Sequence, residues 1–298
     1  MSEHEVQAVD DTAAKATLLG DAWRDLRHNP LFLASGFVVA VMVLMAAFPN
    51  VFSGWFGNGD PRVCDLGRSG DGPASGHPFG FDKQGCDVYA NVIHGARASI
   101  SVGVLVTTFS LLLAITLGSV AGYRGRWLDA LISRMADVFF GFPFILGALV
   151  VLNSLGTRSI WTVSAVLALF MWPTMTRLMR SSVLSVKQMD YVQAARGLGA
   201  GGWRLVRRHI LPNAVAPVMV MATITIGTAI VAEAVLTFLG VGLQAPAISW
   251  GLQLSNAQTD FQMSPHLLIY PSIFLSLTVL SFIVLGDTIR EAFDPRMR

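Results

Sequence analysis

A short string, Gly57-Asn58-Gly59-Asp60, matches the GxGD pattern of intramembrane aspartyl proteases. That chemistry needs two carboxylates that face each other inside the bilayer and share a proton. Asp60 is followed by Pro61 in a Gly-rich segment, and no second Asp within an apolar run is placed to face it. We therefore interpret the match as chance and predict no proteolytic activity.

Other side chains that commonly catalyse reactions or bind cofactors are scattered. The histidines show neither an HExxH motif nor metal-ligand spacing, and they are His4, His28, His77, His94, His209 and His266. No GxSxG nucleophile elbow occurs. None of Lys15, Lys83 and Lys187 follows a glycine, so no GxxxxGK(S/T) loop can form. We predict that the chain is not an enzyme, holds no metal, cofactor or nucleic acid, and receives nucleotide energy from another chain.

The elements that carry these residues are those of an integral membrane protein. Of 298 residues, 53% are hydrophobic and 13% charged, against about 25% charged in soluble domains. A helix needs about 20 apolar residues to cross the hydrocarbon. The sequence predicts an all-α protein with six spans, at 31–49, 98–122, 137–154, 160–177, 215–239 and 267–287. The apolar run from Leu31 is too long for a signal peptide, so we expect a retained anchor.

Basic residues indicate the orientation, because Lys and Arg near helix ends favour the cytoplasmic side. With the N-terminus inside, sixteen of the 21 Lys and Arg residues fall on the inner side and five on the outer side. The inverted topology would put sixteen outside. We therefore expect both termini to be cytoplasmic.

The largest external loop in this topology holds the only two cysteines, Cys64 and Cys86. Disulfides persist outside the cytoplasm. We hypothesise that the two are bridged, which closes a loop of about 20 residues and contributes ~3 kcal/mol in the chain-entropy model. Two unpaired thiols are the alternative.

Ionisable groups are absent from the predicted span centres, where an ion-coupled transporter would need them. Asp137 is expected at the inner end of the third span, paired with Arg134. Asp287 closes the sixth span within one turn of Arg290. Glu233 is expected near the outer interface, about 28 Å along its helix. We favour a structural role for it, a hydrogen bond to a neighbouring helix end, over substrate binding.

The longest inner loop, 178–214, is predicted to form two short helices. Asp190 is a plausible N-cap for a helix over 191–198, and Gly199 would end that helix. A second helix is expected from about 202 to 211, after a turn of small residues.

The second of these helices is amphipathic in pattern. Trp203, Val206 and Ile210 are spaced to share one face. The basic residues lie away from that face, and they are Arg204, Arg207 and Arg208. Pro212 is expected to stop the helix before the fifth span. A basic helix resting on anionic lipid, at ~1 kcal/mol per basic residue, is the alternative, but it would not require the small residues Ala194 and Ala195.

These residues carry a family resemblance. Gln193-Ala194-Ala195, with Gly199 and His209-Ile210-Leu211-Pro212, resembles the EAA loop of bacterial ABC importer permeases, which docks into a groove of the ATPase. More narrowly, the chain resembles the C-type subunit of dipeptide/oligopeptide permeases. The supporting strings are 77–82, 95–99, 122–127, 142–143, 194–199, 233–240, 249–251, 285–287 and 294–296. The chain departs from the family at Gln193, usually Glu, and at Cys86, commonly Arg.

The resemblance implies a type I ABC importer permease fold in the bacterial cell membrane. It implies a heterodimer with a B-type permease, one or two ATPase subunits that use ATP and Mg, and an extracytoplasmic solute-binding protein. The cargo would be di- or oligopeptides; the same machinery with a nickel chelate or glutathione, or a non-transporting scaffold or receptor component, are the alternatives. We expect the binding protein to dock on the first external loop and on residues 241–265.

The resulting organisation and site assignments are as follows. The segments are a cytoplasmic N-terminal segment 1–30, a first transmembrane helix 31–49, an external Gly-rich loop 50–96, a permease core 97–288 with coupling loop 178–214, and a cytoplasmic tail 289–298. By the resemblance, the ATPase-coupling residues are Asp190, Gln193, Ala194, Ala195, Arg196, Gly199, Trp203, Arg207 and Pro212.

Overall fold

The computed structural model describes residues 23–57 and 59–292. Most of the predicted segment 1–30, the end of the predicted tail 289–298 and the 294–296 motif therefore lie outside the described residues.

The helices are α2 (Pro30–Ala47), α3 (Pro49–Ser53), η1 (Leu66–Arg68), α4 (Val88–Leu113), η2 (Ala114–Gly118), α5 (Ser119–Arg124), α6 (Arg126–Gly141), α7 (Phe144–Leu155), α8 (Ile160–Lys187), α9 (Asp190–Gly197), α10 (Gly202–Leu205), η3 (Val206–Ile210), α11 (Leu211–Ala214), α12 (Ala216–Phe238), α13 (Trp250–Ala257) and α14 (His266–Ala292).

Among the described residues, five helices are long and apolar enough to span a membrane, and a bent helix pair makes up to six. The five are α2, the continuous α4–η2–α5 rod, α8, α12 and α14. This arrangement confirms the helical membrane fold predicted from the sequence. The predicted 160–177 span was too short, because α8 continues to Lys187 as an amphipathic extension.

The third predicted span, 137–154, is wrong as a single straight helix. α6 and α7 meet at an angle of 90°. Phe142 has an extended backbone, with φ −92° and ψ 135°, and Pro143 precedes the first residue of α7. Proline disfavours the helical conformation in the residue before it and cannot donate a backbone hydrogen bond, so the helix breaks at this dipeptide.

The second span begins ten residues earlier than predicted. Asp87 caps α4, because its carboxylate accepts hydrogen bonds from the backbone of Tyr89 and Ala90. The last part of the segment predicted as external loop is therefore the first turns of α4. Toward its other end the rod packs closely on α8: a Cβ on Gly118 would lie 2.7 Å from Met179 Cβ.

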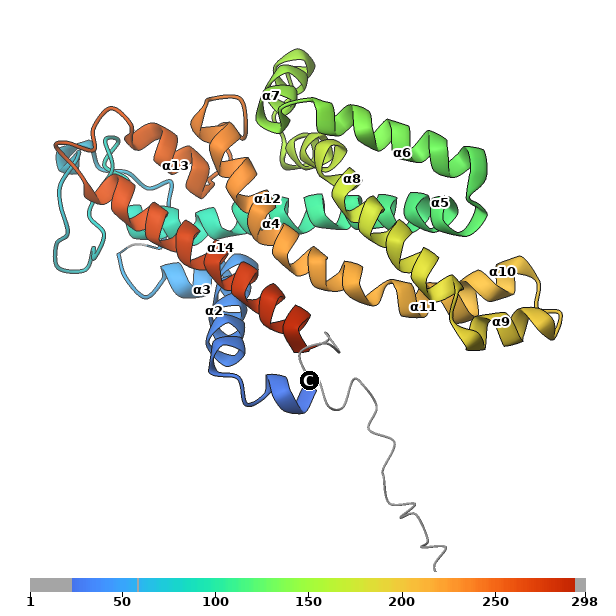
Figure 1. Ribbon diagram of the computed structural model, residues 1–298. Helices are drawn as coiled ribbons and strands as arrows, with labels where there is room; N and C mark the ends of the chain where they lie inside the picture. Colours follow the sequence, from blue (N-terminus) through green and yellow to red (C-terminus); the bar gives the residue numbers. More distant parts are fainter. Residues whose placement is uncertain (1–22, 58, 293–298) are drawn as a thin grey trace, which may run out of the picture.

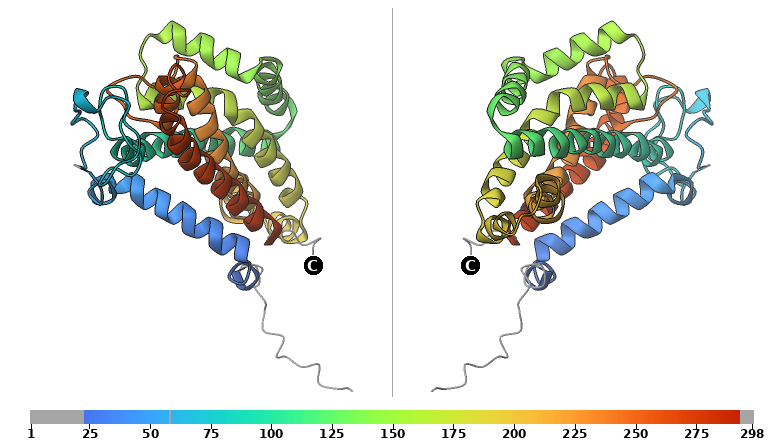
Figure 2. Two further views of the ribbon diagram at one scale, coloured as in Figure 1. Left: turned by 90° about the vertical axis from the view of Figure 1, so that its left-hand side faces the viewer. Right: turned by 90° about the vertical axis from the view of Figure 1, so that its right-hand side faces the viewer.

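Figures 1 and 2 show an elongated helical bundle with a distinct structure at each end. α12 packs against α4, α8 and α14, and α2 packs against α4 and α14. At one end, α9 and α10 project beyond the long helices. At the opposite end lie α13 and the loop between α3 and α4 (Figure 1). We call the first structure, residues 190–214, the α9–α11 hairpin, and the second, residues 54–87 with 241–265, the external end, after the side on which the sequence predicts it to lie.

Candidate functional site

One side-chain hydrogen bond joins the α9–α11 hairpin to α8, and a second joins the end of α8 to α5. Gln193 Nε2 donates to the carbonyl of Lys187, the last residue of α8, at 2.8 Å. Lys187 Nζ donates to the carbonyl of Tyr123 in α5, also at 2.8 Å. The Lys187 ammonium lies 5.4 Å from the centre of the Tyr123 ring, within cation–π range. These contacts tie the start of the hairpin to both α5 and α8.

The buried side of the hairpin is apolar and differs from the predicted one. Leu205 and Ile210 are 2% and 1% exposed, and they pack with Val192 against the C-terminal end of α8 and the N-terminal end of α12. Trp203, predicted on this face, is 76% exposed. The reason is the π-helical turn η3, whose i→i+5 hydrogen bonds set residues five apart on one face. Reading the sequence with the regular α-helical period of 3.6 residues does not reveal this shared buried face.

Three predicted details at the hairpin are corrected or refined. α9 begins at Asp190, and Met189 is the N-cap, without a side-chain cap hydrogen bond. Pro212 does not stop the second helix, because it lies in the first turn of α11, which continues to Ala214. Gly199 follows the end of α9 with φ +82°, a conformation that glycine tolerates and that turns the chain toward α10.

The outer side of the hairpin combines apolar, small and basic side chains. Leu198 is 90% exposed, and Trp203 is also exposed. The other exposed residues of this surface are Asp190, Gln193, Ala194, Arg196, Arg204, Arg207 and Arg208, and Ala195 is partly buried. Exposed large apolar groups among small and basic residues, on a hairpin with a packed inner face, are typical of a protein-docking surface.

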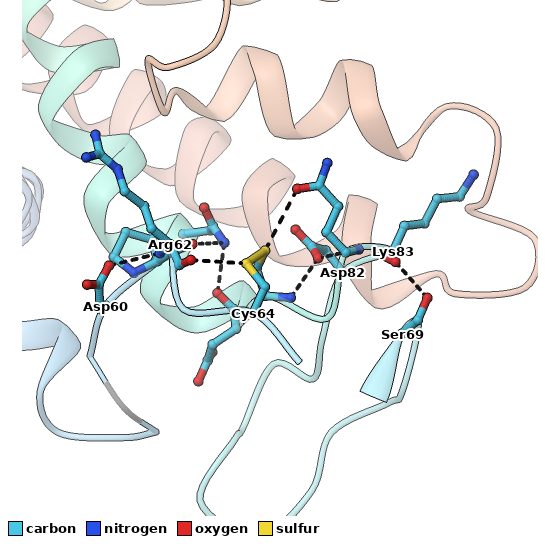
Figure 3. The surroundings of a disulfide bond; sticks show 11 residues. Asp60, Arg62, Cys64, Ser69, Asp82 and Lys83 are labelled. Atoms are coloured by element: carbon cyan, nitrogen blue, oxygen red, sulfur yellow. Dashed lines mark hydrogen bonds between the residues drawn. A yellow bond between two sulfur atoms is a disulfide. The ribbon is translucent and has the colours of Figure 1, made fainter. Parts of the chain in front are cut away.

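The external end is closed by the disulfide between Cys64 and Cys86, which confirms the predicted bridge. Figure 3 shows the bond and the polar residues around it. Asp82 accepts hydrogen bonds from the backbone N–H groups of Gln84 and Cys86, and burial raises the pKa of its carboxyl. Ser69 Oγ donates to the carbonyl of Lys83 at 2.7 Å (Figure 3).

Polar contacts join the same loop to residues 260–266, much later in the chain. Lys83 Nζ lies 2.5 Å from the carboxylate of Asp260, which lowers the pKa of Asp260. Ser264 Oγ donates to the carbonyl of Gly70, and His266 Nε2 lies 3.1 Å from the carbonyl of Phe81. Between the loop and α13 runs a groove of about 610 Å³. Its walls include Arg62, Cys64, Cys86, Asn91, Ile248 and Gln253.

Glu233 lies fully buried where α4, α12 and α13 meet. Its carboxylate accepts hydrogen bonds from Thr237 at 2.8 Å, from Ser249 at 3.2 Å and from Ser99 at 3.4 Å. Ser249 is the N-cap of α13, and Ser99 also accepts the backbone N–H of Trp250. Sequence reasoning missed Ser99 and Ser249 as partners, because only the fold brings these distant hydroxyls together.

Asp137 and Asp287 lie elsewhere. α6 begins at Arg126, so Asp137 is well inside the helix and not at its inner end. Its carboxylate lies 3.8 Å from Arg134 but 2.5 Å from Arg177 of α8, a closer partner than the predicted one. Asp287 is exposed near the C-terminal end of α14, three residues before Arg290. Neither residue belongs to the α9–α11 hairpin or to a long helix next to it in sequence.

Comparison with known proteins gives consistent matches over most of the chain. A family model described as "Binding-protein-dependent transport system inner membrane component" matches residues 114–298. A second, "N-terminal TM domain of oligopeptide transport permease C", matches residues 17–60.

Individual relatives include a glutathione transport system permease protein, GsiD, of Pectobacterium atrosepticum, 36% identical over 93% of this chain and 90% of that protein. A dipeptide transport system permease protein, DppC, of Alkalihalophilus pseudofirmus is 37% identical over the same shares. The solved "Crystal structure of an amino acid ABC transporter with histidines" is similar in fold, with a TM-score of 0.52 and 16% identity over 66% of this chain and 91% of that one.

Proposed function

This chain belongs to the family of binding-protein-dependent transport system inner membrane components, and from that premise we propose that it forms half of the pathway of an ATP-driven importer of small peptides. Its relatives are transport permeases, among them a dipeptide and a glutathione permease. Both cargoes are short peptides, which supports this substrate class over a nickel chelate.

The α9–α11 hairpin is the ATPase-docking element in this proposal. The observation that carries it is the two-sided character of the hairpin: Val192, Leu205 and Ile210 are buried against α8 and α12, while Leu198 and Trp203 stand exposed on the other side. Closure of the ATPases on ATP and Mg would push this outer surface. The packed inner face would then pass the movement to the long helices.

The remaining assignments follow from this one. Both termini and the hairpin are cytoplasmic, in the membrane of a bacterial cell, and the external end faces outward. A B-type permease supplies the other half of the pathway. The extracytoplasmic binding protein docks at the external end, where two segments far apart in sequence form one groove of about 610 Å³. Glu233 is structural and holds α13 to α4 and α12, and the chain itself catalyses no reaction.

Gly199→Asp, or deletion of residues 193–199, tests the docking assignment. Asp at φ +82° is strained, so the turn after α9 would change shape and the ATPase would lose its docking surface. We expect peptide uptake by the reconstituted complex to be abolished while membrane insertion is intact, and the ATPase to be lost on co-purification. Unchanged co-purification would show that the ATPase docks elsewhere, and normal peptide uptake would favour a non-transporting scaffold.

Gly76→Asp is a matched control, because Gly76 also has a positive φ, +80°, and has open space around it, but lies at the external end. We expect it to leave ATPase co-purification unchanged. Orientation has a separate test: an impermeant thiol reagent added to intact cells should not reach a cysteine placed at Trp203.

A further inference from the structure

α6 and the C-terminal half of α8 carry exposed charged, hydroxyl-bearing and small residues that neither the hairpin nor the external groove uses. On α6 they are spaced i, i+4 and i+7, so they share one face of the helix. On α8 they are spaced by three and four residues. We call these six exposed residues the polar strip: Ala130, Arg134, Asp137, Thr174, Arg177 and Ser181.

Charged groups of the strip join the two helices. Arg177 Nη2 lies 2.5 Å from Asp137 Oδ1, and Arg134 Nη1 lies 3.8 Å from Asp137 Oδ2. The Arg177 guanidinium lies 4.1 Å from the centre of the Phe140 ring. Although paired, the Arg134, Asp137 and Arg177 side chains remain 86%, 47% and 53% exposed. The strip is therefore an open surface with two positive charges and one negative charge.

These charges lie well inside two membrane-spanning elements. Arg177 precedes Lys187, the inner end of α8, by about 15 Å of helix, and Asp137 follows Arg126, the start of α6, by about 17 Å. Charged side chains at such positions rarely face lipid and instead face protein or a water-filled space.

The neighbouring surface of α6 is entirely different. A second exposed face, which we call the apolar stripe, is formed by Trp127, Leu131, Met135 and Val138. The outer half of α8 likewise exposes Trp161, Ala165 and Leu169. Because the apolar stripe suits lipid or a partner permease, the adjoining polar strip is the face of α6 suited to water. α6 lies beside α5 and α8 (Figure 1), and the residues of both faces are exposed.

We propose that the polar strip lines the water-filled inner half of the transport pathway and binds the free carboxylate of the transported peptide through Arg134 and Arg177. This rests on the proposed function. The surplus positive charge favours an anion, and arginine presents a planar fork of N–H donors that matches a carboxylate. A peptide carboxylate would replace Asp137 as a partner of the two guanidinium groups while the peptide passes.

Adjacent cysteines test whether the strip faces water. Both native cysteines are in the disulfide, so an introduced cysteine is the chain's single free thiol. Ala130→Cys lies on the polar strip and Leu131→Cys, one residue further, on the apolar stripe. In the full complex in inside-out vesicles, we expect an impermeant sulfonate-bearing thiol reagent to label Ala130→Cys at least tenfold faster. Equal labelling, or faster labelling of Leu131→Cys, would overturn the assignment of the water-facing side.

Charge reagents test the anion preference without any peptide. In the Ala130→Cys background, Arg134→Gln should lower the ratio of anionic to cationic reagent rates about threefold or more, and Arg134→Lys should restore most of it. An unchanged ratio would contradict an anion site here. If the preference is present in liposomes of zwitterionic lipid alone and is lost when anionic lipid is added, the arginines contact headgroups and the proposal fails.

Uptake of trialanine by the reconstituted complex completes the test. We expect Arg134→Gln to reduce uptake at low substrate concentration about fivefold, Arg134→Lys to reduce it less than twofold, and Arg27→Gln, an exposed arginine before α2, to leave it unchanged. If the wild-type complex takes up trialanine and Arg134→Gln does not change this uptake, only this inference is overturned. No trialanine uptake by the wild-type complex would instead overturn the proposed peptide function.

Discussion

The external end and the α9–α11 hairpin are both small, loop-rich structures at opposite ends of the bundle, and they are held by different means. The external end is cross-linked by Cys64–Cys86 and fastened to the α13–α14 region by polar contacts such as Lys83–Asp260. The hairpin has no cross-link and is held by a few buried apolar side chains and the Gln193–Lys187 hydrogen bond.

This difference matches the two tasks we propose. A docking platform for a soluble binding protein benefits from one fixed shape, which a disulfide and several long-range hydrogen bonds provide. A hairpin that transmits force must move together with α8 and α12, and it needs a packed inner face more than a rigid outline. We therefore expect changes at the two ends to affect separate properties of the complex.

Removal of the disulfide should give the largest effect. Cys64→Ser together with Cys86→Ser should destabilise the external end by about 3 kcal/mol, because the bridge closes a loop across a sequence separation of 22 residues. Hydrogen exchange of the purified complex should show protection lost in residues 60–87 and kept in residues 190–214. Protection lost equally at both ends would contradict the separation of the two structures.

Leu198→Asp should be the corresponding change at the hairpin. A charge in place of an apolar side chain that is 90% exposed costs the isolated chain little, but it removes an apolar contact at a docked surface. We expect roughly tenfold weaker association with the ATPase, measured by titration of the purified subunits. Leu66→Asp, at a leucine 77% exposed in the external end, is the control and should leave that affinity unchanged.

The sequence predicted most of the fold, because length and apolarity decide where a helix crosses a membrane. It did not predict the 90° break at Phe142-Pro143, since the apolar run continues through both residues. It also underestimated α4, because the Asp87 cap lies in a segment that glycine and proline mark as loop.

At the site, local motifs were informative and tertiary partners were not. The EAA-like string and the positive-φ Gly199 are readable from residue types, and so is the closeness of the two cysteines in one loop. The exposure of Trp203 depends on a π-helical turn, and the Arg177–Asp137 pair depends on how α6 crosses α8. The spacing of residues in a single sequence predicts neither feature.

Gln193→Glu should have a moderate effect at the hairpin and none at the external end. Glu is usual at this position in the family that the chain resembles, but Gln193 Nε2 here donates to the carbonyl of Lys187, and a carboxylate cannot donate. We expect a loss of about 1 kcal/mol, seen as faster hydrogen exchange at the α8–α9 junction and a severalfold loss of peptide-stimulated ATPase activity. Gln84→Glu, on the external loop, serves as the control. Unaltered exchange at the junction would mean that this hydrogen bond does not hold the hairpin.

The smallest expected effect is that of Asp260→Asn, and it depends on pH. The Lys83 ammonium holds the pKa of the partly buried Asp260 carboxyl below its ordinary value. A lowered folded-state pKa means that the pair stabilises the external end above the unfolded pKa, about 4, and that this contribution is lost as pH falls through the folded value. Ion pairs with an exposed partner such as Lys83 contribute little, so Asp260→Asn should speed exchange in residues 60–87 by less than about twofold at pH 7.

At a pH below both the folded-state and the unfolded-state pKa of Asp260, the variant and the wild type should exchange at the same rate, because Asp260 is then protonated in both states. Asp82, whose pKa burial raises, is present in both proteins and cancels in the comparison. A difference in exchange rate between variant and wild type that grew on acidification would have the wrong sign for a lowered pKa. It would mean that the Lys83–Asp260 pair does not join the disulfide loop to the segment before α14. The hairpin is a further internal reference, because it is remote from this pair and its exchange should be the same in both proteins at every pH.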